Sequence, residues 1–403
     1  MPGEVPGADL EIPMAQAILD FPALPAEDAV GFELGRDFAR HALTPPPDRL
    51  AASSPLRQGW AAGRASFGAR RLEPTPHVRQ WLQLRLDAWR RGRAFESVLV
   101  TPNYLRQIDV ACCPVTRRAL TRCTGSASDA SVDRVRDDAG YAAGNLAVMS
   151  ALANAAKGAC SFDGALARMR LAEACQVPAA GEAVRPELGG LDAAEWARVA
   201  VLCSFVTALP HDQAASLPLL LLPPNRLRLL NPVQALQALL TRQFGRDGLS
   251  ARLTRIEALL PRKPVQRDFR LFVNALLPRV LERGRPADAQ AMRRTLEDAW
   301  RDPLALRCWS RLARQLSAGQ AEQIVLRASA PGLDGRWAQA FTPEEATEGW
   351  ELEHGGYRME SLERSCESPG PRRQRCPPAP LPALSRGAFP DRKTCASSRL
   401  AGR

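Results

Sequence analysis

Residues 112–158 read CCPVTRRALTRCTGSASDASVDRVRDDAGYAAGNLAVMSALANAAKG, and this stretch decides the fold class that the sequence predicts. Residues 130–135 alternate in the manner of a strand, and residues 137–140 supply Asp and Gly for a turn. A second short apolar run covers residues 146–149, and the Ala-rich segment 150–157 favours a helix. The stretch therefore predicts the order strand, loop, strand, helix.

This order, together with the residues at the junctions, resembles the HNH nuclease family, whose metal site lies on a two-strand, one-helix module. Its members commonly show a Cys before a Pro/Thr turn, an Asp-His pair ending the first strand, Gly-Tyr and Gly-Asn in the loop, and Asn or His before a helical Lys. The corresponding segments here are Cys113-Pro114-Val115-Thr116, Val132-Asp133-Arg134-Val135, Gly140-Tyr141, Gly144-Asn145-Leu146 and Asn154-Ala155-Ala156-Lys157. The resemblance covers roughly an eighth of the chain.

Arg134 stands where most members of the family carry the histidine that activates the attacking water. A guanidinium stays protonated at any working pH, so Arg134 cannot be the general base, although its planar fork could clamp a phosphate. The resemblance implies that Asp133 and Asn154 hold Mg²⁺ or Mn²⁺, a sensible partial shell of oxygen ligands, and that Asn145 fixes the loop. The predicted catalytic set is therefore Asp133, Arg134 and Asn145. Arg134 and Lys157 are predicted to contact nucleic acid.

An amphipathic helix is predicted over residues 77–91, just before this module. Its apolar residues recur at helical spacing, and they include Trp81 and Trp89. Arg90 and Arg91 lie outside the apolar stripe, which makes them candidate phosphate contacts beside the module. The alternative is that the tryptophans are core anchors and that the arginines form a solvated face.

The cysteines indicate thiols rather than a structural zinc site. A zinc site would have to combine Cys113 and Cys123 with a distant partner such as Cys160, because the chain contains no Cys-x-x-Cys pair. The ten cysteines are scattered, and residues 1–9 lack the features of a secretory signal. The apolar run at 217–222 is too short to cross a membrane. These features predict a cytoplasmic protein with reduced thiols and no membrane association.

Beyond residue 158 the sequence predicts one helix after another, with Asp192 as a capping residue for one of them. The segment 210–232 interrupts the pattern with prolines and is predicted to be a loop that buries Leu219 to Leu222. His211 in this loop could supply the missing base if the loop folds back onto the module. The predicted helices cover residues 162–176, 193–208, 232–244, 249–260, 265–283, 286–300 and 304–317.

The C-terminal region 355–403 differs in composition from the rest of the chain. It contains ten basic and four acidic residues, so it carries a net charge of +6 out of the total of +11, and it has seven prolines. Such a composition predicts disorder. The tail is either a basic arm that binds nucleic acid through charge or the product of out-of-frame translation past a frameshift, and the second interpretation is favoured.

The sequence thus predicts a mainly α-helical α+β protein in which a small ββα-metal, HNH-like module is embedded between helices and a disordered tail follows. The predicted regions are a loosely structured N-terminal part (1–75), the module with flanking helices (76–176), a helical domain (190–330) and the tail (355–403).

An active module would be a metal-dependent nuclease that hydrolyses DNA phosphodiesters. The alternative is a non-catalytic nucleic-acid-binding or protein-interaction protein that keeps the HNH-like fold, which loss of the histidine favours. The third alternative is a helical scaffold with a fortuitous resemblance. The choice between DNA and RNA and the oligomeric state are left open by the sequence.

Overall fold

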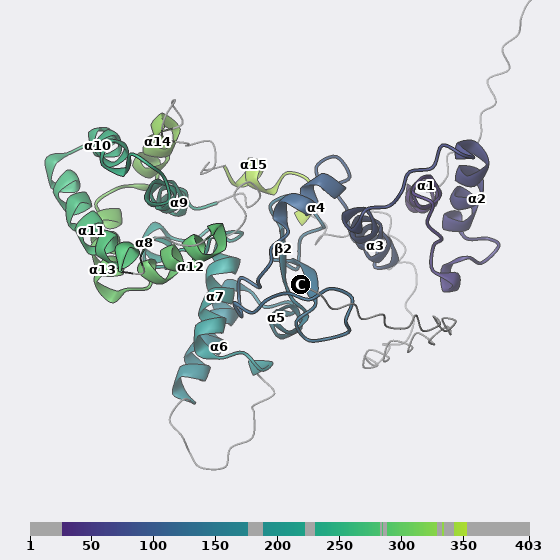
Figure 1. The fold of residues 1–403 in the computed structure, drawn as a ribbon, viewed down its shortest axis with the longest axis horizontal. Helices are drawn as coiled ribbons and strands as arrows, with labels where there is room; N and C mark the ends of the chain where they lie inside the picture. The colour runs from purple at the N-terminus through teal and green to yellow at the C-terminus, as the bar shows by residue number, and fades with distance from the viewer. Residues whose placement is uncertain are drawn as a thin grey trace, which may run out of the picture. The chain divides into compact units, whose positions relative to one another are not determined.

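The structure is a computed structural model that describes residues 26–175, 188–221, 230–282, 284, 288–328, 333 and 342–352. It is mainly helical, at 60% helix, with an antiparallel two-strand hairpin followed by a helix, as predicted (Figure 1). All of these residues belong to one compact unit, Met1–Glu363. The predictions for residues 1–25 and for the tail lie outside the described residues.

The elements follow one another along the chain in the order that Figure 1 labels. They are α1 (Ala26–Arg40), the 3₁₀ turn Pro47–Arg49, α2 (Pro55–Phe67), α3 (Pro76–Arg90), α4 (Pro102–Ile108), β1 (Ala130–Arg134), β2 (Leu146–Ser150), α5 (Ala151–Lys157), α6 (Phe162–Ala174), α7 (Ala193–Ser204), α8 (His211–Ala215), α9 (Pro232–Phe244), α10 (Leu249–Leu259), α11 (Lys263–Leu281), α12 (Ala289–Trp300), α13 (Pro303–Arg314), α14 (Ala318–Ala328) and α15 (Pro343–Thr347).

The hairpin and α5 form the predicted module at the expected positions. In the antiparallel register, Ala130 is opposite Ser150 and Arg134 is opposite Leu146. Ser150 ends β2 and also caps α5, because its side chain accepts a hydrogen bond from Ala153 N. Every residue of β2 is buried, so this strand packs on both of its faces.

The two faces of β2 belong to two different hydrophobic clusters. Ala147 and Met149 join the large core that continues into the helices from α6 onward. Leu146 and Val148 join a smaller cluster with residues of α3 and α4, among them Tyr104. The alternation of side chains along a strand produces this division. The hairpin is therefore held between helices that precede it and helices that follow it in the chain.

The N-terminal region is more ordered than the sequence predicts. Helices α1 and α2 pack against each other at backbone contact, and glycines allow this approach. A Cβ atom on Gly35 would lie 2.1 Å from Leu56 O, and one on Gly59 would lie 1.8 Å from Phe32 O. Within the segment 1–75, which is predicted to be mostly extended or loosely packed with a helix around residues 29–42, the structure describes two packed helices, α1 and α2. The close helix pair is not evident from the composition, because glycine has a low intrinsic helix propensity.

The helices after the module begin and end close to the predicted positions. Asp192 caps α7 in a full capping box with Glu195, as its place in the sequence indicates. At the centre of this region, the rings of Phe272, Trp300 and Trp309 pack together with centroids 5.0 to 5.6 Å apart. This aromatic cluster anchors α11, α12 and α13 against one another.

Long-range contacts fasten the module to the helices that follow it. Arg117 Nη1 lies 2.5 Å from Asp298 Oδ1, and Arg117 Nη2 lies 3.1 Å from Glu297 Oε2 on α12. Trp350, which is fully buried, donates from Nε1 to Ala143 O in the hairpin loop (3.1 Å). The module and the helices that follow it thus share one hydrophobic core.

Among the described helices, none combines the length and the apolar character that crossing a membrane requires.

Candidate functional site

The loop between the two strands is ordered by the side chain of Asn145, which is fully buried. Its Oδ1 atom accepts a hydrogen bond from Arg136 N at 2.8 Å, and its Nδ2 atom donates to Arg136 O and Gly140 O at 3.0 Å each. A side-chain amide offers both a donor and an acceptor, so it satisfies backbone groups that no strand pairs. Asn145 thus acts on the loop, which is the role that the resemblance implies for it, and its burial separates it from any substrate.

Arg134 holds the same loop through its guanidinium. The Nη1 atom donates to Asp137 O and Ala139 O at 2.9 Å each, and Nη2 lies 2.6 Å from Asp137 Oδ1. The charge also lies 5.1 Å from the ring centroid of Tyr141, within the range of a cation–π contact. These contacts occupy a side chain that is only 10% exposed. Arg134 would have to leave them before it could clamp a phosphate.

Asp133 and Lys157 form a buried ion pair between β1 and α5. Lys157 Nζ lies 2.9 Å from Asp133 Oδ2, and it also donates to Arg134 O (3.0 Å) and Gly158 O (3.1 Å). Two of the three N–H donors of the ammonium thus have backbone acceptors, and its charge lies against the carboxylate. The Lys157 side chain is 0% exposed and that of Asp133 is 9% exposed. This burial argues against the predicted contact between Lys157 and nucleic acid.

The electrostatic environment of Asp133 is set by two opposing effects. Burial disfavours the carboxylate and raises the pKa of Asp133 to about 6, while the positive charge of Lys157 acts in the opposite direction. Asp133 Oδ2 has no directed hydrogen bond within the described residues beyond the ion pair with Lys157. The carboxylate therefore depends on Lys157 for its compensation.

Asn154 is the second predicted metal ligand, and it contacts the strand. Its Nδ2 atom donates to Ser131 Oγ at 2.7 Å, so the side chain links α5 to β1. Ser131 and Asp133 lie on the same face of β1, because side chains alternate along a strand. The structure thus brings Asp133, Asn154 and Lys157 to one side of the module, as the resemblance implies.

These residues do not fit a divalent metal ion in this conformation. The Lys157 ammonium already stands against the Asp133 carboxylate, in the place that the cation of a metal site would take. Mg²⁺ and Mn²⁺ need several oxygen ligands and retain water, whereas this carboxylate is buried. Within the residues that the structure describes, no group of three or more His, Cys, Asp or Glu side chains is placed to hold a metal.

The cysteines considered for zinc lie in different environments. Cys113 is buried, and its Sγ atom accepts hydrogen bonds from Thr116 N and from Ser150 N and Oγ at 3.3 to 3.4 Å. Burial favours a high pKa for the Cys113 thiol, but the hydrogen bonds from Ser150 and Thr116 together outweigh it and lower the pKa. Cys123 is exposed. Cys113 therefore acts as a hydrogen-bond acceptor that joins its turn to the end of β2.

Three further predicted positions lie apart from this face. Arg90 and Arg91, at the end of α3, are exposed, and Arg90 makes only a long 3.8 Å contact with Asp87. His211 lies in α8, where its Nε2 atom is 2.9 Å from Ala313 O of α13. The imidazole is thus held within the helical region, which gives no support to a role as the missing base.

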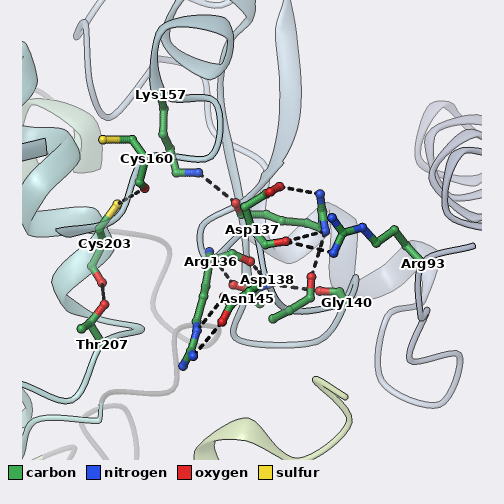
Figure 2. Close-up of polar contacts among 12 residues, drawn as sticks. Arg93, Arg136, Asp137, Asp138, Gly140, Asn145, Lys157, Cys160, Cys203 and Thr207 are labelled. Carbon is green, nitrogen blue, oxygen red and sulfur yellow. Dashed lines mark hydrogen bonds and ion pairs between the residues drawn. The ribbon is translucent and has the colours of Figure 1, made fainter. Parts of the chain in front are cut away.

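A cavity of about 580 Å³ opens beside the hairpin loop (Figure 2). Its lining combines the loop residues Arg136, Asp137 and Asp138 with Cys160 before α6 and Cys203 at the end of α7. Arg136 makes a bidentate pair with Asp138, with both distances at 2.8 Å. Burial raises the pKa of the Cys203 thiol to about 12, so this thiol is unreactive at neutral pH. The cavity therefore presents paired charges and no activated nucleophile.

The burial of Lys157 is the feature of the site that the sequence analysis missed. One signal was present, because the chain uses arginine for nearly all of its basic residues and contains only three lysines. At this buried position a compact ammonium fits better than a planar guanidinium.

Comparisons with known proteins find no relative of this chain: no family model, no curated protein and no solved structure matches it.

Proposed function

We propose that this chain is a non-catalytic nucleic-acid-binding protein in which a degenerate HNH-like module serves as a structural scaffold. The observation that carries the proposal is the buried Asp133–Lys157 pair, whose ammonium takes the place of a metal cation. Arg134 adds to it, because its guanidinium is bound to the loop and cannot accept a proton from water. Within the described residues, the module therefore offers neither a fitting metal site nor the base that hydrolysis of a phosphodiester requires.

Nucleic-acid binding is supported by an arginine-rich surface on α2 and the residues around it. Residues 49–72 contain five arginines and no acidic residue. Arg57, Arg64 and Arg71 are exposed, and none of them forms an ion pair within the described residues. Arg64 lies over the ring of Trp60 at 4.9 Å, which leaves its N–H groups directed outward in the plane of the fork. Such a surface can bind phosphate groups. Arg90 and Arg91, at the end of α3, are two further exposed arginines.

The test combines a binding assay and a cleavage assay on the full chain. We expect a duplex DNA or RNA to bind with an affinity that falls steeply as salt increases, because counterions are released. The variant Arg57→Ser/Arg64→Ser/Arg71→Ser should bind several-fold more weakly with a shallower salt dependence. The matched control replaces three exposed arginines of α10, α11 and α13, Arg255→Ser/Arg267→Ser/Arg314→Ser, and should bind like the parent protein.

Supercoiled plasmid should remain intact with Mg²⁺ or Mn²⁺ as well as with EDTA. Metal-dependent nicking that disappears in Asp133→Ala would contradict the proposal and make the chain a nuclease with an unusual base. If neither DNA nor RNA binds at low salt, the proposal of nucleic-acid binding is contradicted, but the proposal of a non-catalytic module is not.

A further inference from the structure

An unusual cluster of arginines lies where the module meets the helical region. Arg117 comes from the turn after Cys113, Arg198 from α7, and Arg293, Arg294 and Arg301 from α12 and the residue that follows it. Arg117 takes both nearby carboxylates, Glu297 and Asp298. Within the described residues, the other four arginines have no carboxylate at ion-pair distance. Positive charge has therefore collected at an internal junction without matching acidic partners.

Burial makes the imbalance costly for Arg198, while the other four side chains are half-buried. Arg198 is 8% exposed, and its only hydrogen bond in the described part of the chain runs from Nη1 to Val115 O at 2.9 Å. The Nε atoms of Arg117, Arg198, Arg294 and Arg301 are buried without a hydrogen-bond partner among the described residues. A buried donor that lacks a partner destabilises the folded state, and a charged one does so more strongly.

Titration cannot relieve the repulsion. Burial is the main cause that lowers the pKa of Arg301, to about 10, and the charges of Arg198 and Arg117 lower it further. Burial and the charge of Arg117 likewise lower the pKa of Arg198. The contacts bring these side chains to one junction, because Arg117 pairs with Glu297 and Asp298 of α12 and Arg301 follows about one helical turn after Asp298. Arg198 reaches the turn that carries Arg117, since it donates to Val115 O. A group with a pKa of about 10 still carries its proton at neutral pH, so the charges persist.

The nearest other carboxylates are already engaged. Asp192 and Glu195 act on Arg198 electrostatically, but they form the capping box of α7 with each other's backbone N–H groups. Glu297 accepts from Leu221 N in addition to Arg117. A mobile anion would compensate the cluster, because a guanidinium fork matches the geometry of an oxyanion.

We propose that a phosphate-type oxyanion binds among Arg117, Arg198 and Arg301 and stabilises the junction between the module and the helical region. This site is separate from the exposed arginines of α2, and its occupation does not depend on the binding of nucleic acid. The anion is a small free ion, since the cluster lies between packed elements.

The test uses Arg301→Gln, because the Arg301 side chain makes no hydrogen bond or ion pair within the described residues, so the substitution removes a charge without breaking a polar contact. Thermal unfolding of the full chain is measured in inorganic phosphate, in sulfate and in chloride at equal ionic strength. We expect phosphate at about ten times its Kd to raise the Tm by about 2 °C or more over chloride. Arg301→Gln should lose this response and, without phosphate, should melt at a higher temperature than the parent, because repulsion is relieved.

The control is Arg267→Gln, which removes one positive charge from an exposed position of α11 and should keep the full response to phosphate. Equal Tm values in phosphate and chloride would overturn the proposal. A lower Tm of Arg301→Gln in chloride would also overturn it, since a purely structural role for Arg301 predicts that result. A short oligonucleotide that reproduces the shift when inorganic phosphate does not would assign the cluster to nucleic acid instead.

Discussion

Lys157 illustrates how much one side chain can decide in this module. Its ammonium donates to two backbone carbonyls and lies 2.9 Å from a carboxylate oxygen, so the compact group fits where a planar guanidinium would not. The same charge that excludes a metal ion also compensates Asp133. The same ion pair thus compensates the buried carboxylate and makes this position a poor fit for a metal ion.

Removal of one partner of this pair should be strongly destabilising. Lys157→Met leaves the Asp133 carboxylate buried without compensation, and we expect the free energy of unfolding to fall by about 3–5 kcal/mol. The double variant Lys157→Met/Asp133→Leu should recover part of that loss, because neither charge remains. Urea unfolding of both variants checks this, and a loss under 1 kcal/mol for Lys157→Met would argue that water reaches the pair.

Asp129 provides a pH-dependent contact in the loop before β1. Its carboxylate accepts from the hydroxyls of Thr121 and Thr124 and from the backbone N–H groups of Thr124 and Gly125, and these bonds lower the pKa of Asp129 to about 2. A lowered pKa means that the contribution to stability is present above about pH 4 and is lost as the pH falls toward 2.

The stability difference between the parent and Asp129→Asn should therefore be constant from pH 7 to pH 5 and should shrink below pH 4. Urea unfolding across this range measures it. A difference that grows on acidification would show that the hydroxyl contacts do not favour the carboxylate.

At the scale of elements, the α1–α2 pair depends on glycine for its closeness. A methyl group on Gly59 would meet the backbone of Phe32, which cannot rotate away, so the helices would have to separate. The residues buried between them, such as Leu34 and Leu56, would then lose packing. Glycine usually destabilises a helix, but at Gly59 it allows α1 and α2 to pack closely.

Gly59→Ala should lower the free energy of unfolding by about 1–3 kcal/mol, in spite of the higher helix propensity of alanine. Gly319→Ala is the matched control, because a Cβ atom there meets nothing within 4 Å and alanine favours a helix. The control should be neutral or stabilising by up to about 1 kcal/mol. Thermal unfolding of both variants separates the loss of packing from the gain in helix propensity. Equal Tm values for Gly59→Ala and Gly319→Ala would show that α1 and α2 move apart easily.

At the scale of the whole molecule, residues near the end of the described chain complete the hairpin loop. Trp350 O accepts from Gly140 N at 2.9 Å, and Trp350 Nε1 donates to Ala143 O at 3.1 Å. Its ring is fully buried and belongs to the large core. The module is therefore finished only by a segment that lies about two hundred residues further along the chain.

Trp350→Ala should cost about 3–5 kcal/mol of stability through lost packing. Trp350→Phe keeps most of the bulk but leaves Ala143 O without its donor, so we expect a smaller loss of about 1–3 kcal/mol. Hydrogen exchange of the amides in residues 136–145 should rise in both variants, and most in Trp350→Ala. Unchanged protection of this loop would show that the module is stable without Trp350.

The sequence by itself determined the features of this protein that have local causes. The order strand, loop, strand, helix follows from alternation, turn residues and Ala-rich composition over residues 130–157, and the structure confirms it. The helices from α6 onward follow from periodicity and from caps such as Asp192. These signals act over a few residues, so a single sequence contains them in full.

Tertiary structure alone decided the environments of the functional candidates. The sequence allows Asp133 and Asn154 to be metal ligands. Only the structure shows that the Lys157 ammonium is buried beside the Asp133 carboxylate. Arg117 meets Asp298, a residue 181 positions further along the chain, and the arginine cluster depends on that junction. Burial and charge compensation are set by contacts between distant segments, and no local pattern of residues specifies which segments meet.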